Sequence, residues 1–286
     1  MTQLAPFYKN VQAHYDLSND FYSLFLGPSM VYSCAYFERP EMTLEEAQLA
    51  KIDLSLGKCE LQPGQRLLDI GCGWGGTVRR AVEKFGVSAI GLTLSQAQAD
   101  YDREHLADLG GRAEVRLQGW EEFDEPVDRI VSIGAFEHFR EERYADFFAK
   151  AFRLLPAGAP LLLHSIVFLE FAQLDRPEMK ITEDDAKFVK FIAREIFPGG
   201  QLRSPSIICR YAREAGFEIT RQHSLQPHYA TTLQIWADRL VANRDAAIRL
   251  TSEKTFDTYL RYLTGCASYF RNKKIDVVQF SLRKPS

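Results

Sequence analysis

Residues 67–85 read LLDIGCGWGGTVRRAVEKF, an apolar run, a cluster of glycines and then a helical pattern. Gly71, Gly73 and Gly76 fit the spacing G-x-G-x-x-G, which lets a backbone turn approach a ligand closely after a strand and before a helix. The spacing alone does not say which ligand is held. The stretch therefore predicts a strand, a ligand-binding turn and a helix.

Further apolar runs alternate with helical patterns along the chain. We expect strands at residues 66–71, 87–94, 114–120, 128–136, 160–167 and 277–282, and helices at 77–85, 95–109 and 141–155. Strands that alternate with helices at this spacing predict an α/β fold with a parallel sheet covered on both faces. Ligands of such sheets bind beyond the carboxyl ends of the strands.

Three regions of a single domain spanning 1–286 fall outside this alternation. They are a helical, aromatic N-terminal segment (1–60), an insertion (168–204) and a helical stretch (230–274) before the last strand. In the insertion, FVKFIAREIF places Phe188, Phe191, Ile192 and Ile196 on one helical face before PGG stops the helix. Such additions predict a large or apolar substrate, although ordinary thickening of the core explains many of the same side chains.

Composition and charge exclude several classes of partner and of bound group. The chain has 35 Lys and Arg against 38 Asp and Glu, a balance that argues against nucleic acid. The N-terminal sequence does not resemble a signal peptide, and the most apolar run, 161–169, is too short to span a bilayer. The cysteines have no close pair, so neither zinc nor a disulfide framework is indicated: Cys34, Cys59, Cys72, Cys209 and Cys266. We expect a cytoplasmic protein without integral membrane association.

The residues around the glycines favour one class of nucleotide. A nicotinamide cofactor calls for Asp or Glu at the end of the second strand, where this chain has Thr93. Trp74 also crowds a turn that would have to admit a pyrophosphate. A sulfonium ligand has no phosphates, and Asp69, just before the loop, can organise its amino-acid end. S-adenosylmethionine is therefore favoured over a dinucleotide, which stays as the alternative.

Several longer motifs resemble the mycolic acid cyclopropane synthase family and, more broadly, the cyclopropane fatty acid synthases. They are YSCAYF (32–37), LLDIGCGWG (67–75), GLTLSQAQ (91–98), GWEEFDEPVDRIVSIGAFEHF (119–139), FIAREIFPGG (191–200), SLQPHYATTL (224–233) and RYLTGCASYF (261–270). The resemblance implies a class I, Rossmann-like methyltransferase fold with a seven-stranded, mostly parallel sheet and helical additions that form a lipid site. It also implies S-adenosyl-L-methionine and a long-chain unsaturated acyl substrate.

The resemblance further implies the cofactor contacts. These are Tyr32, Ser33, Leu67, Leu68, Asp69, Ile70, Gly71, Cys72, Gly73, Trp74, Gly75, Thr93, Leu94, Ser95, Gln96, Ala97, Gln98, Trp120, Glu121, Ile133 and Gly134. Thr93 and Gln98 can offer a hydroxyl and an amide to the ribose. Trp120 can pack on adenine beside Glu121; a plain core position for Trp120 and a solvated face for Glu121 are the alternatives.

Methylation of an alkene creates a carbocation, which sets two requirements. Aromatic faces can stabilise the cation by about 0.5–2 kcal/mol each, and the candidates are Tyr15, Tyr32, Phe136, Tyr229, Trp236, Tyr259 and Phe270. Ring closure also needs a proton acceptor, and the family resemblance implies a bicarbonate or carbonate ion. The implied holders are Cys34, through its backbone, with Glu137, His164 and Tyr229. His138 in place of Glu137, and His164 as a core histidine, are the alternatives.

The resemblance marks Cys266 as an active-site cysteine. A thiolate would compete with the alkene for the methyl group, so a small buried side chain beside an acyl tunnel is the alternative. Residues 168–186 match the family poorly, which leaves the product open between a cyclopropane and a hydroxyl- or alkene-bearing methyl branch. The intact Glu137 favours the ring. A small-molecule O- or N-methyltransferase is a further function class.

The substrate is expected to arrive on an acyl carrier protein. Basic residues of the insertion and the region after it can steer an acidic carrier, and they are Lys187, Lys190, Arg194, Arg203, Arg210 and Arg213. A solvated helix face explains the same charges, and a transient membrane contact through the aromatic N-terminal segment is the rival route.

Overall fold

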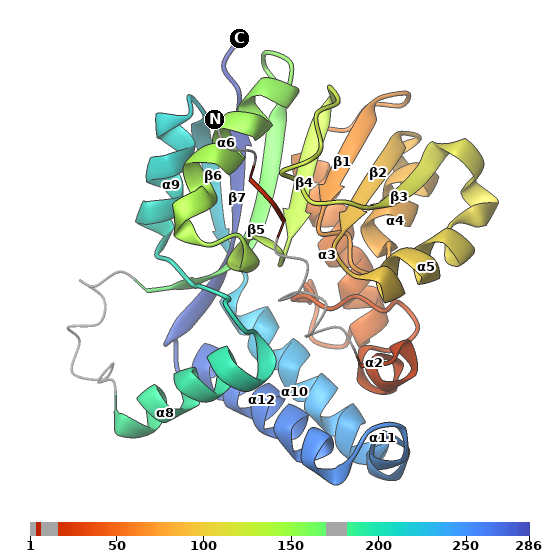
Figure 1. Cartoon of the computed structure of the whole chain (residues 1–286), viewed down its shortest axis with the longest axis vertical. Coiled ribbons are helices and arrows are strands. Elements are labelled where there is room, and N and C mark those ends of the chain that lie inside the picture. Colours follow the sequence, from red (N-terminus) through yellow and green to blue (C-terminus); the bar gives the residue numbers. More distant parts are fainter. Residues whose placement is uncertain (1–3, 7–16, 170–181) are drawn as a thin grey trace.

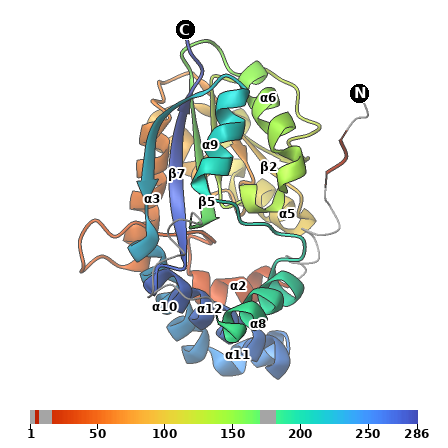
Figure 2. The same cartoon turned by 90° about the vertical axis from the view of Figure 1, so that its left-hand side faces the viewer.

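The computed structural model describes residues 4–6, 17–169 and 182–286. A twisted sheet with helices on both faces forms one part, and a layer of helices lies at the end of the sheet where the parallel strands finish (Figures 1 and 2). The strands are β1 (Arg66–Ile70), β2 (Ser88–Thr93), β3 (Ala113–Leu117), β4 (Arg129–Ile133), β5 (Pro160–Phe168), β6 (Glu218–Ser224) and β7 (Ile275–Arg283).

The sheet has the order β3-β2-β1-β4-β5-β7-β6. The first five strands pair in parallel, whereas β7 runs antiparallel to both β5 and β6. The order of the strands reverses at β1 and β4, because β2 and β3 lie on one side of β1 and β4 lies on the other. Such a switch point opens a crevice beyond the carboxyl ends of the two strands. The expected seven-stranded, mostly parallel methyltransferase sheet is confirmed.

Two groups of helices cover the sheet. On one face α3 (Leu44–Lys58) and α4 (Gly76–Phe85) contribute Ile52 and Val78 to a buried cluster with Leu162 of β5. On the other face α6 (Tyr144–Leu154) and α9 (Pro205–Glu214) contribute Phe148 and Ile208. The helix α5 (Gln96–His105) follows β2, and short 3-10 segments lie at η1 (Ala107–Arg112), η2 (Phe136–His138) and η3 (Glu141–Arg143).

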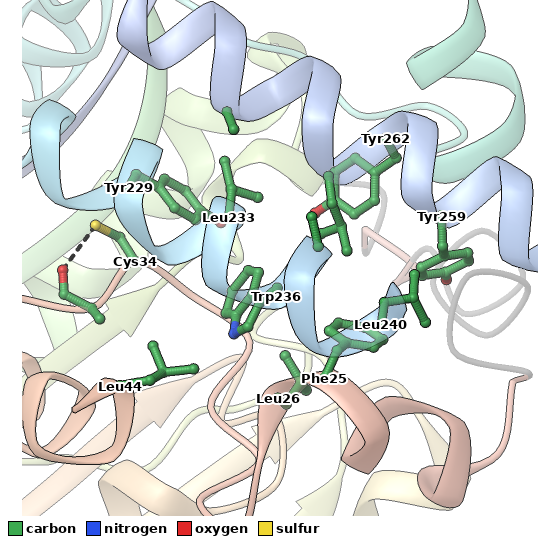
Figure 3. Close-up of a cluster of buried hydrophobic side chains, with 14 of the residues drawn as sticks. Phe25, Leu26, Cys34, Leu44, Tyr229, Leu233, Trp236, Leu240, Tyr259 and Tyr262 are labelled. Atoms are coloured by element: carbon green, nitrogen blue, oxygen red, sulfur yellow. Dashed lines mark hydrogen bonds between the residues drawn. The ribbon is translucent and has the colours of Figure 1, made fainter. Parts of the chain in front are cut away.

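The helical layer has its own core. It comprises α2 (Asn19–Leu26), α8 (Glu183–Phe191), the π-helical turn Ile192–Ile196, α10 (Gln226–Ala242), α11 (Arg244–Leu250) and α12 (Glu253–Arg271). Aromatic side chains from α2, α10 and α12 meet around Trp236 (Figure 3). The expected helical regions before residue 60 and between 230 and 274 are therefore present, the second divided into three helices. Residues 1–3, 7–16 and 170–181 of the expected additions lie outside the described residues.

Two sequence expectations differ from the structure. The strand β6 was not predicted from the pattern, because this edge strand is mostly solvent-exposed and reads as polar. The helix expected at 188–197 begins earlier, at Glu183, where Thr182 and Asp185 form a reciprocal capping box. It then changes to π-helical hydrogen bonding at Ile192, so its apolar side chains do not follow one α-helical face.

The core of the helical layer gives a test of its packing. Trp236 is fully buried, with ring centroids 5.5 Å from Tyr32 and 6.3 Å from Phe25. Because the indole leaves a large cavity when removed, Trp236→Ala should lower the free energy of unfolding by about 3–5 kcal/mol in urea titrations. Val241→Ala, on the half-exposed side of the same helix, should change it by less than about 1 kcal/mol. Equal losses in the two variants would contradict a packed helical core.

Candidate active site

The glycine loop is shaped by left-handed backbone and by one close contact. Gly71, Gly73 and Gly75 have φ values of 84°, 58° and 72°, which favour glycine. A Cβ on Gly71 would lie 2.3 Å from the Cβ of Ala135, so this glycine allows β1 to pack on the turn after β4. A Cβ on Gly73 would meet nothing within 4 Å, because the residue borders open space. The open space above Gly73 is a cavity.

This first cavity lies beyond the carboxyl ends of β1, β2 and β4. Most of the expected cofactor residues line it: Tyr32, Ser33, Asp69, Ile70, Gly71, Cys72, Gly73, Trp74, Thr93, Leu94, Gln98, Trp120, Glu121, Ile133 and Gly134. The lining also includes residues that the sequence did not single out for the cofactor, among them Met30, Lys51, Gln118, His138 and Phe139. Residues of segment 30–33, of the loops that follow β1, β2, β3 and β4, and of α3 therefore surround one space.

Six expected cofactor residues do not line this cavity. Leu67 and Leu68 point into the two cores on either side of β1. Gly75 packs over Asp102, and Ser95 caps α5 by accepting a hydrogen bond from the Gln98 backbone at 3.3 Å. Gln96 and Ala97 are exposed on the first turn of α5. These six residues therefore belong to the strand, loop and helix next to the cavity and not to its wall.

One end of the first cavity carries two buried ionisable groups. Lys51 donates to the hydroxyl of Ser33 at 2.8 Å, and burial lowers the pKa of Lys51 to about 8. Burial raises the pKa of Asp69 to about 7, and its Oδ2 has no hydrogen-bond partner within the described residues. An unpartnered carboxyl and a buried ammonium in one cavity fit the ammonium and carboxylate of an amino acid. This end of the site therefore fits the methionine part of S-adenosylmethionine.

The other side of the cavity combines an aromatic ring with amide and hydroxyl groups. The Thr93 hydroxyl donates to Gln98 Oε1 at 2.7 Å, which leaves the Gln98 amide nitrogen to donate elsewhere. Trp120 lines the cavity and also packs edge-on against Phe147, so it serves both the cavity and the core. Glu121 is ion-paired with Arg143 at 2.8 Å, and burial raises its pKa. The alternative that placed Glu121 on a solvated face is therefore wrong.

A second, apolar cavity adjoins the first. Its walls come from β5, α8, the π-helical turn, α10, α12 and β7, with Phe168, Phe188, Ile192, Leu233 and Phe270 among the apolar contributors. Tyr32, Ser33, Gly134 and His138 line both cavities. These four residues form the boundary between a largely polar space and an apolar one.

A small polar cluster lies in the wall of the second cavity. Glu137 Oε1 accepts the backbone N–H of Ile166 at 2.6 Å, whereas its Oε2 is buried without a partner in the described ranges. Burial raises the pKa of Glu137 to about 7. His164 is buried, and its Nε2 likewise has no partner among those residues. Tyr229 lines the same cavity. Two unpartnered buried polar atoms facing one cavity fit a small anion such as bicarbonate.

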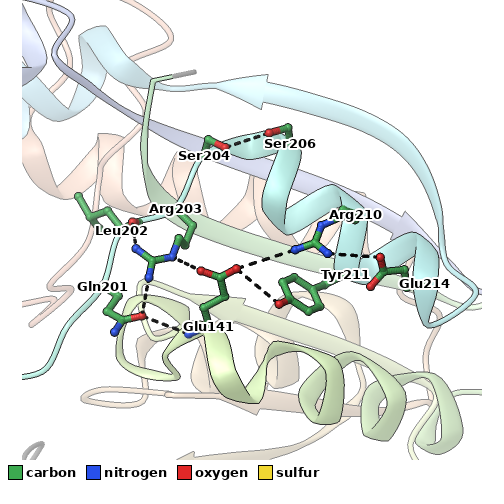
Figure 4. A network of polar contacts seen from close by, with 9 residues as sticks. All are labelled: Glu141, Gln201, Leu202, Arg203, Ser204, Ser206, Arg210, Tyr211 and Glu214. Carbon is green, nitrogen blue, oxygen red and sulfur yellow. Dashed lines mark hydrogen bonds and ion pairs between the residues drawn. The ribbon is translucent and has the colours of Figure 1, made fainter. Parts of the chain in front are cut away.

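The turn that carries Glu137 is braced by the returning end of the insertion. The Gln201 backbone N–H donates to the Glu137 carbonyl at 2.8 Å. Glu141, four residues later, accepts hydrogen bonds from Arg203 and from the hydroxyl of Tyr211, and it pairs with Arg210 at 3.8 Å (Figure 4). This network ties residues 137–141 to residues 201–211.

The other residues predicted to take part in the reaction, two cysteines and a histidine, lie in different surroundings. Cys34 is fully buried, lines neither cavity and donates its thiol to the Ala35 carbonyl at 3.1 Å. Cys266 does line the second cavity, and burial raises the pKa of its thiol to about 12. Burial lowers the pKa of His138 to about 4, so its ring is neutral at pH 7.

Some of the aromatic residues expected to stabilise a cation line the second cavity, and others are buried in the hydrophobic cores. Tyr32, Tyr229 and Phe270 line the second cavity, whereas Phe136, Trp236 and Tyr259 are buried in the two cores and line neither cavity. Tyr15 lies outside the described residues. The sequence reading missed Tyr262, which lines the cavity and whose hydroxyl accepts from Tyr32 at 3.2 Å. Its helical spacing to Cys266, Tyr269 and Phe270 is the signal that could have found it.

None of the described helices is both long enough and apolar enough to cross a membrane. Within the same residues no cluster of three or more His, Cys, Asp or Glu side chains could hold a metal ion.

Known proteins resemble this chain over nearly its whole length. A family model described as mycolic acid cyclopropane synthetase matches residues 2–280. The chain is 55% identical to cyclopropane mycolic acid synthase 1 of Mycobacterium tuberculosis over 284 residues, 99% of each chain. The solved structure of the cyclopropane synthase MmaA2 from the same organism has a TM-score of 0.97 at 53% identity, with 99% of this chain and all of that one covered. CmaA1 complexed with SAH and CTAB gives 0.95 at 55% identity, covering 98% and 99%.

The glycine loop provides a matched pair of variants. Gly73 and Gly64 both have positive φ and open space around the position of a Cβ, but only Gly73 borders the first cavity. Valine at either site should cost about 1–2 kcal/mol of stability through backbone strain. Gly73→Val should also abolish S-adenosylmethionine binding in calorimetry, because its side chain fills the cavity, whereas Gly64→Val should bind normally. Wild-type affinity in a folded Gly73→Val protein would contradict the assignment of this loop to the cofactor.

Proposed function

Because the chain belongs to the mycolic acid cyclopropane synthetase family of S-adenosylmethionine-dependent methyltransferases, we propose that it methylates a carbon–carbon double bond in a long-chain, mycolic-type fatty acyl substrate and closes a cyclopropane ring. The observation that carries the proposal is the boundary shared by the two cavities. A polar space suited to the cofactor meets an apolar space suited to an acyl chain at Tyr32, Ser33, Gly134 and His138.

In this proposal the cofactor binds in the first cavity and the acyl chain binds in the second. S-adenosylmethionine supplies an electrophilic methyl group on a sulfonium. Asp69 and Lys51 hold the amino-acid end of the cofactor in the first cavity, and Trp120 flanks the adenine. The acyl chain lies along Phe168, Phe188 and Ile192, whose side chains exclude water from the double bond.

The second cavity can stabilise a cation without offering a strong nucleophile. Tyr32, Tyr229, Tyr262 and Phe270 present aromatic rings to it, each able to contribute about 0.5–2 kcal/mol. The Cys266 thiol stays protonated at pH 7 because burial raises its pKa to about 12. We therefore assign Cys266 to the cavity wall and not to nucleophilic chemistry.

Ring closure requires loss of a proton from the transferred methyl group. Bound bicarbonate supplies a weak base, and the site holds it through Glu137, His164 and Tyr229, all of which line the second cavity. Cys34 lines neither cavity, so its expected role as a holder rests on the family resemblance alone. Glu137, with a pKa of about 7, can donate to or accept from the anion near neutral pH.

Two other outcomes compete with ring formation. Capture of the cation by water gives a hydroxyl-bearing methyl branch, and loss of a different proton gives an alkene with a methyl branch. The buried, mainly apolar wall of the second cavity disfavours water capture. The same wall disfavours a small polar substrate, the choice of an ordinary O- or N-methyltransferase.

The variant Glu137→Gln tests whether Glu137 serves the chemical step without contributing to cofactor binding. Because Glu137 lines only the second cavity, the variant should bind S-adenosylmethionine within about twofold of wild type. Product formation should fall by about 10²-fold or more, as expected for loss of a group that serves proton transfer. The assay is mass spectrometry of an unsaturated acyl substrate for gain of one CH₂, with the exposed Glu142→Gln as control.

Wild-type enzyme in bicarbonate-depleted buffer should lose ring formation and regain it when bicarbonate is added back. Unchanged ring formation in depleted buffer would refute the anion's role. Methylation of small amines or alcohols in preference to the alkene would refute the proposed function.

We further propose that an acyl carrier protein delivers the substrate at α8. Val189 and Ala193 are exposed and also line the second cavity, so the cavity opens beside them. The basic patch is smaller than the sequence suggested, because Lys187 pairs with Asp184, Arg194 with Glu195, and Arg203 and Arg210 with Glu141. Of the six basic residues, Lys190 and Arg213 make no ion pair within the described residues, and Lys190 adjoins Val189.

Charge reversal tests this delivery route. Lys190→Glu should raise KM for carrier-bound substrate several-fold and leave kcat unchanged, because only encounter with the acidic carrier is weakened. Turnover of carrier-bound substrate should also fall as salt rises. Lys254→Glu, near the start of α12 and beside α11, is the matched control. Equal rates on carrier-bound and vesicle-embedded substrates, insensitive to salt and to Lys190→Glu, would rule the carrier out in favour of membrane delivery.

A further inference from the structure

We propose that Gln279 is a positioning residue that holds the His164 ring with its proton on Nε2. His164 then donates a hydrogen bond into the second cavity and cannot act as a base there. The role in catalysis rests on the proposed function, whereas the state of the ring follows from contacts behind it.

Gln279 lies next to His164 in the middle of the sheet. The two residues are direct partners in the antiparallel pairing of β5 with β7, so their side chains project from the same face. Gln279 is fully buried, and its amide Nε2 lies 3.3 Å from His164 Nδ1. The same amide contacts two residues of α3, Ser55 and Lys58.

The orientation of the Gln279 amide follows from both neighbours. Ser55 uses its one hydroxyl proton to donate to the Lys51 carbonyl at 2.8 Å, so toward Gln279 it can only accept. The amide NH₂ group must therefore face Ser55, at 3.0 Å. On the other side Lys58 donates to the amide oxygen. Each contact independently requires the same orientation.

This orientation determines the state of His164. The Gln279 NH₂ group points a proton at Nδ1, which must accept and therefore carries no proton. Burial, together with the charges of Lys51 and Lys58, lowers the pKa of His164, so the ring is neutral. The single proton of a neutral ring with a bare Nδ1 is on Nε2. Nε2 is the buried atom that has no partner among residues 4–6, 17–169 and 182–286.

The donor state suits a site that handles electrophiles. A bare Nε2 facing the second cavity would be a nucleophile beside a methyl donor and a carbocation, and it could trap either. A protonated Nε2 offers instead a hydrogen bond to an anion oxygen. The proton lost on ring closure then goes to the anion, or through it to Glu137, and not to His164.

The experiment measures which nitrogen of the His164 ring carries the proton, and it does not require enzymatic turnover. In protein labelled with ¹⁵N-histidine, the His164 signals, assigned by their loss in His164→Phe, should show a protonated Nε2 and a bare Nδ1. Gln279→Glu places a carboxylate acceptor at Nδ1 and should move the proton to Nδ1. Gln279→Met, which neither donates nor accepts, should give a mixture of the two forms. Gln222→Glu, the same change at an exposed position of β6, should leave the spectrum unaltered.

Measurements of product formation and of S-adenosylmethionine affinity then distinguish a positioning role for Gln279 from general damage to the structure. Gln279→Glu should lower product formation by about 10- to 100-fold, the loss expected for one hydrogen bond to a charged group, with S-adenosylmethionine affinity within about twofold of wild type. A bare Nε2 in the wild type, or an unchanged ring in both Gln279 variants, would overturn the proposal. If Gln279→Glu fails to fold by circular dichroism, Gln279→Met decides. A wild type that shows the expected ring but does not methylate alkenes would refute the proposed function and leave the positioning role standing.

Discussion

Residues 32–35 join the two halves of the protein, and the contact between the cavities depends on how they are held. On the side of the sheet, α3 binds this segment twice: Gln48 donates to the Ser33 carbonyl and Lys51 to its hydroxyl, each at 2.8 Å. On the side of the helical layer, Tyr32 bonds Tyr262 of α12, and the Ala35 N–H donates to Thr232 of α10. This short segment therefore contributes Tyr32 and Ser33 to the wall that the two cavities share. Displacement of either layer would separate the first cavity from the second.

The ionisable groups are divided between the cavities in a way that suits the proposed chemistry. The first cavity has a carboxyl and an ammonium, Asp69 and Lys51, which match a zwitterionic amino-acid end. In the second, His164 is neutral, and burial raises the pKa of Glu137 to about 7, so its carboxyl is partly protonated near neutral pH. A fixed cation there would oppose a developing carbocation. Aromatic rings and neutral donors avoid that repulsion and leave the proposed bicarbonate as the anion that accepts the proton.

The sequence predicted the parts of the structure whose pattern follows from burial. Parallel strands covered on both faces read as apolar runs, so β1, β2, β4 and β5 were found within a few residues. The strand β6 was missed because an exposed edge lacks that signal. Periodicity also cannot say whether a buried aromatic faces a cavity or a core, which is why Trp236 and Tyr259 looked like wall residues. Lys51 and Gln279 were missed because polar side chains in such positions are usually solvated, and only the tertiary fold buries them.

Charge patterns are still less informative than apolar ones, since a sequence does not show which charges neutralise one another. Arg203 and Arg210 looked like part of a surface for an acidic partner, yet both lie against Glu141 (Figure 4). Glu141 in turn braces the turn that carries Glu137, and Gln201 binds the Glu137 carbonyl from the same segment. These partly exposed arginines therefore neutralise a carboxylate of the same chain and brace a turn beside the second cavity. Because their network lies at the returning end of the insertion, a segment that lines the second cavity also braces the backbone of the turn that carries Glu137. Under the proposed function, a change in this segment therefore alters both the wall along the acyl chain and the position of Glu137.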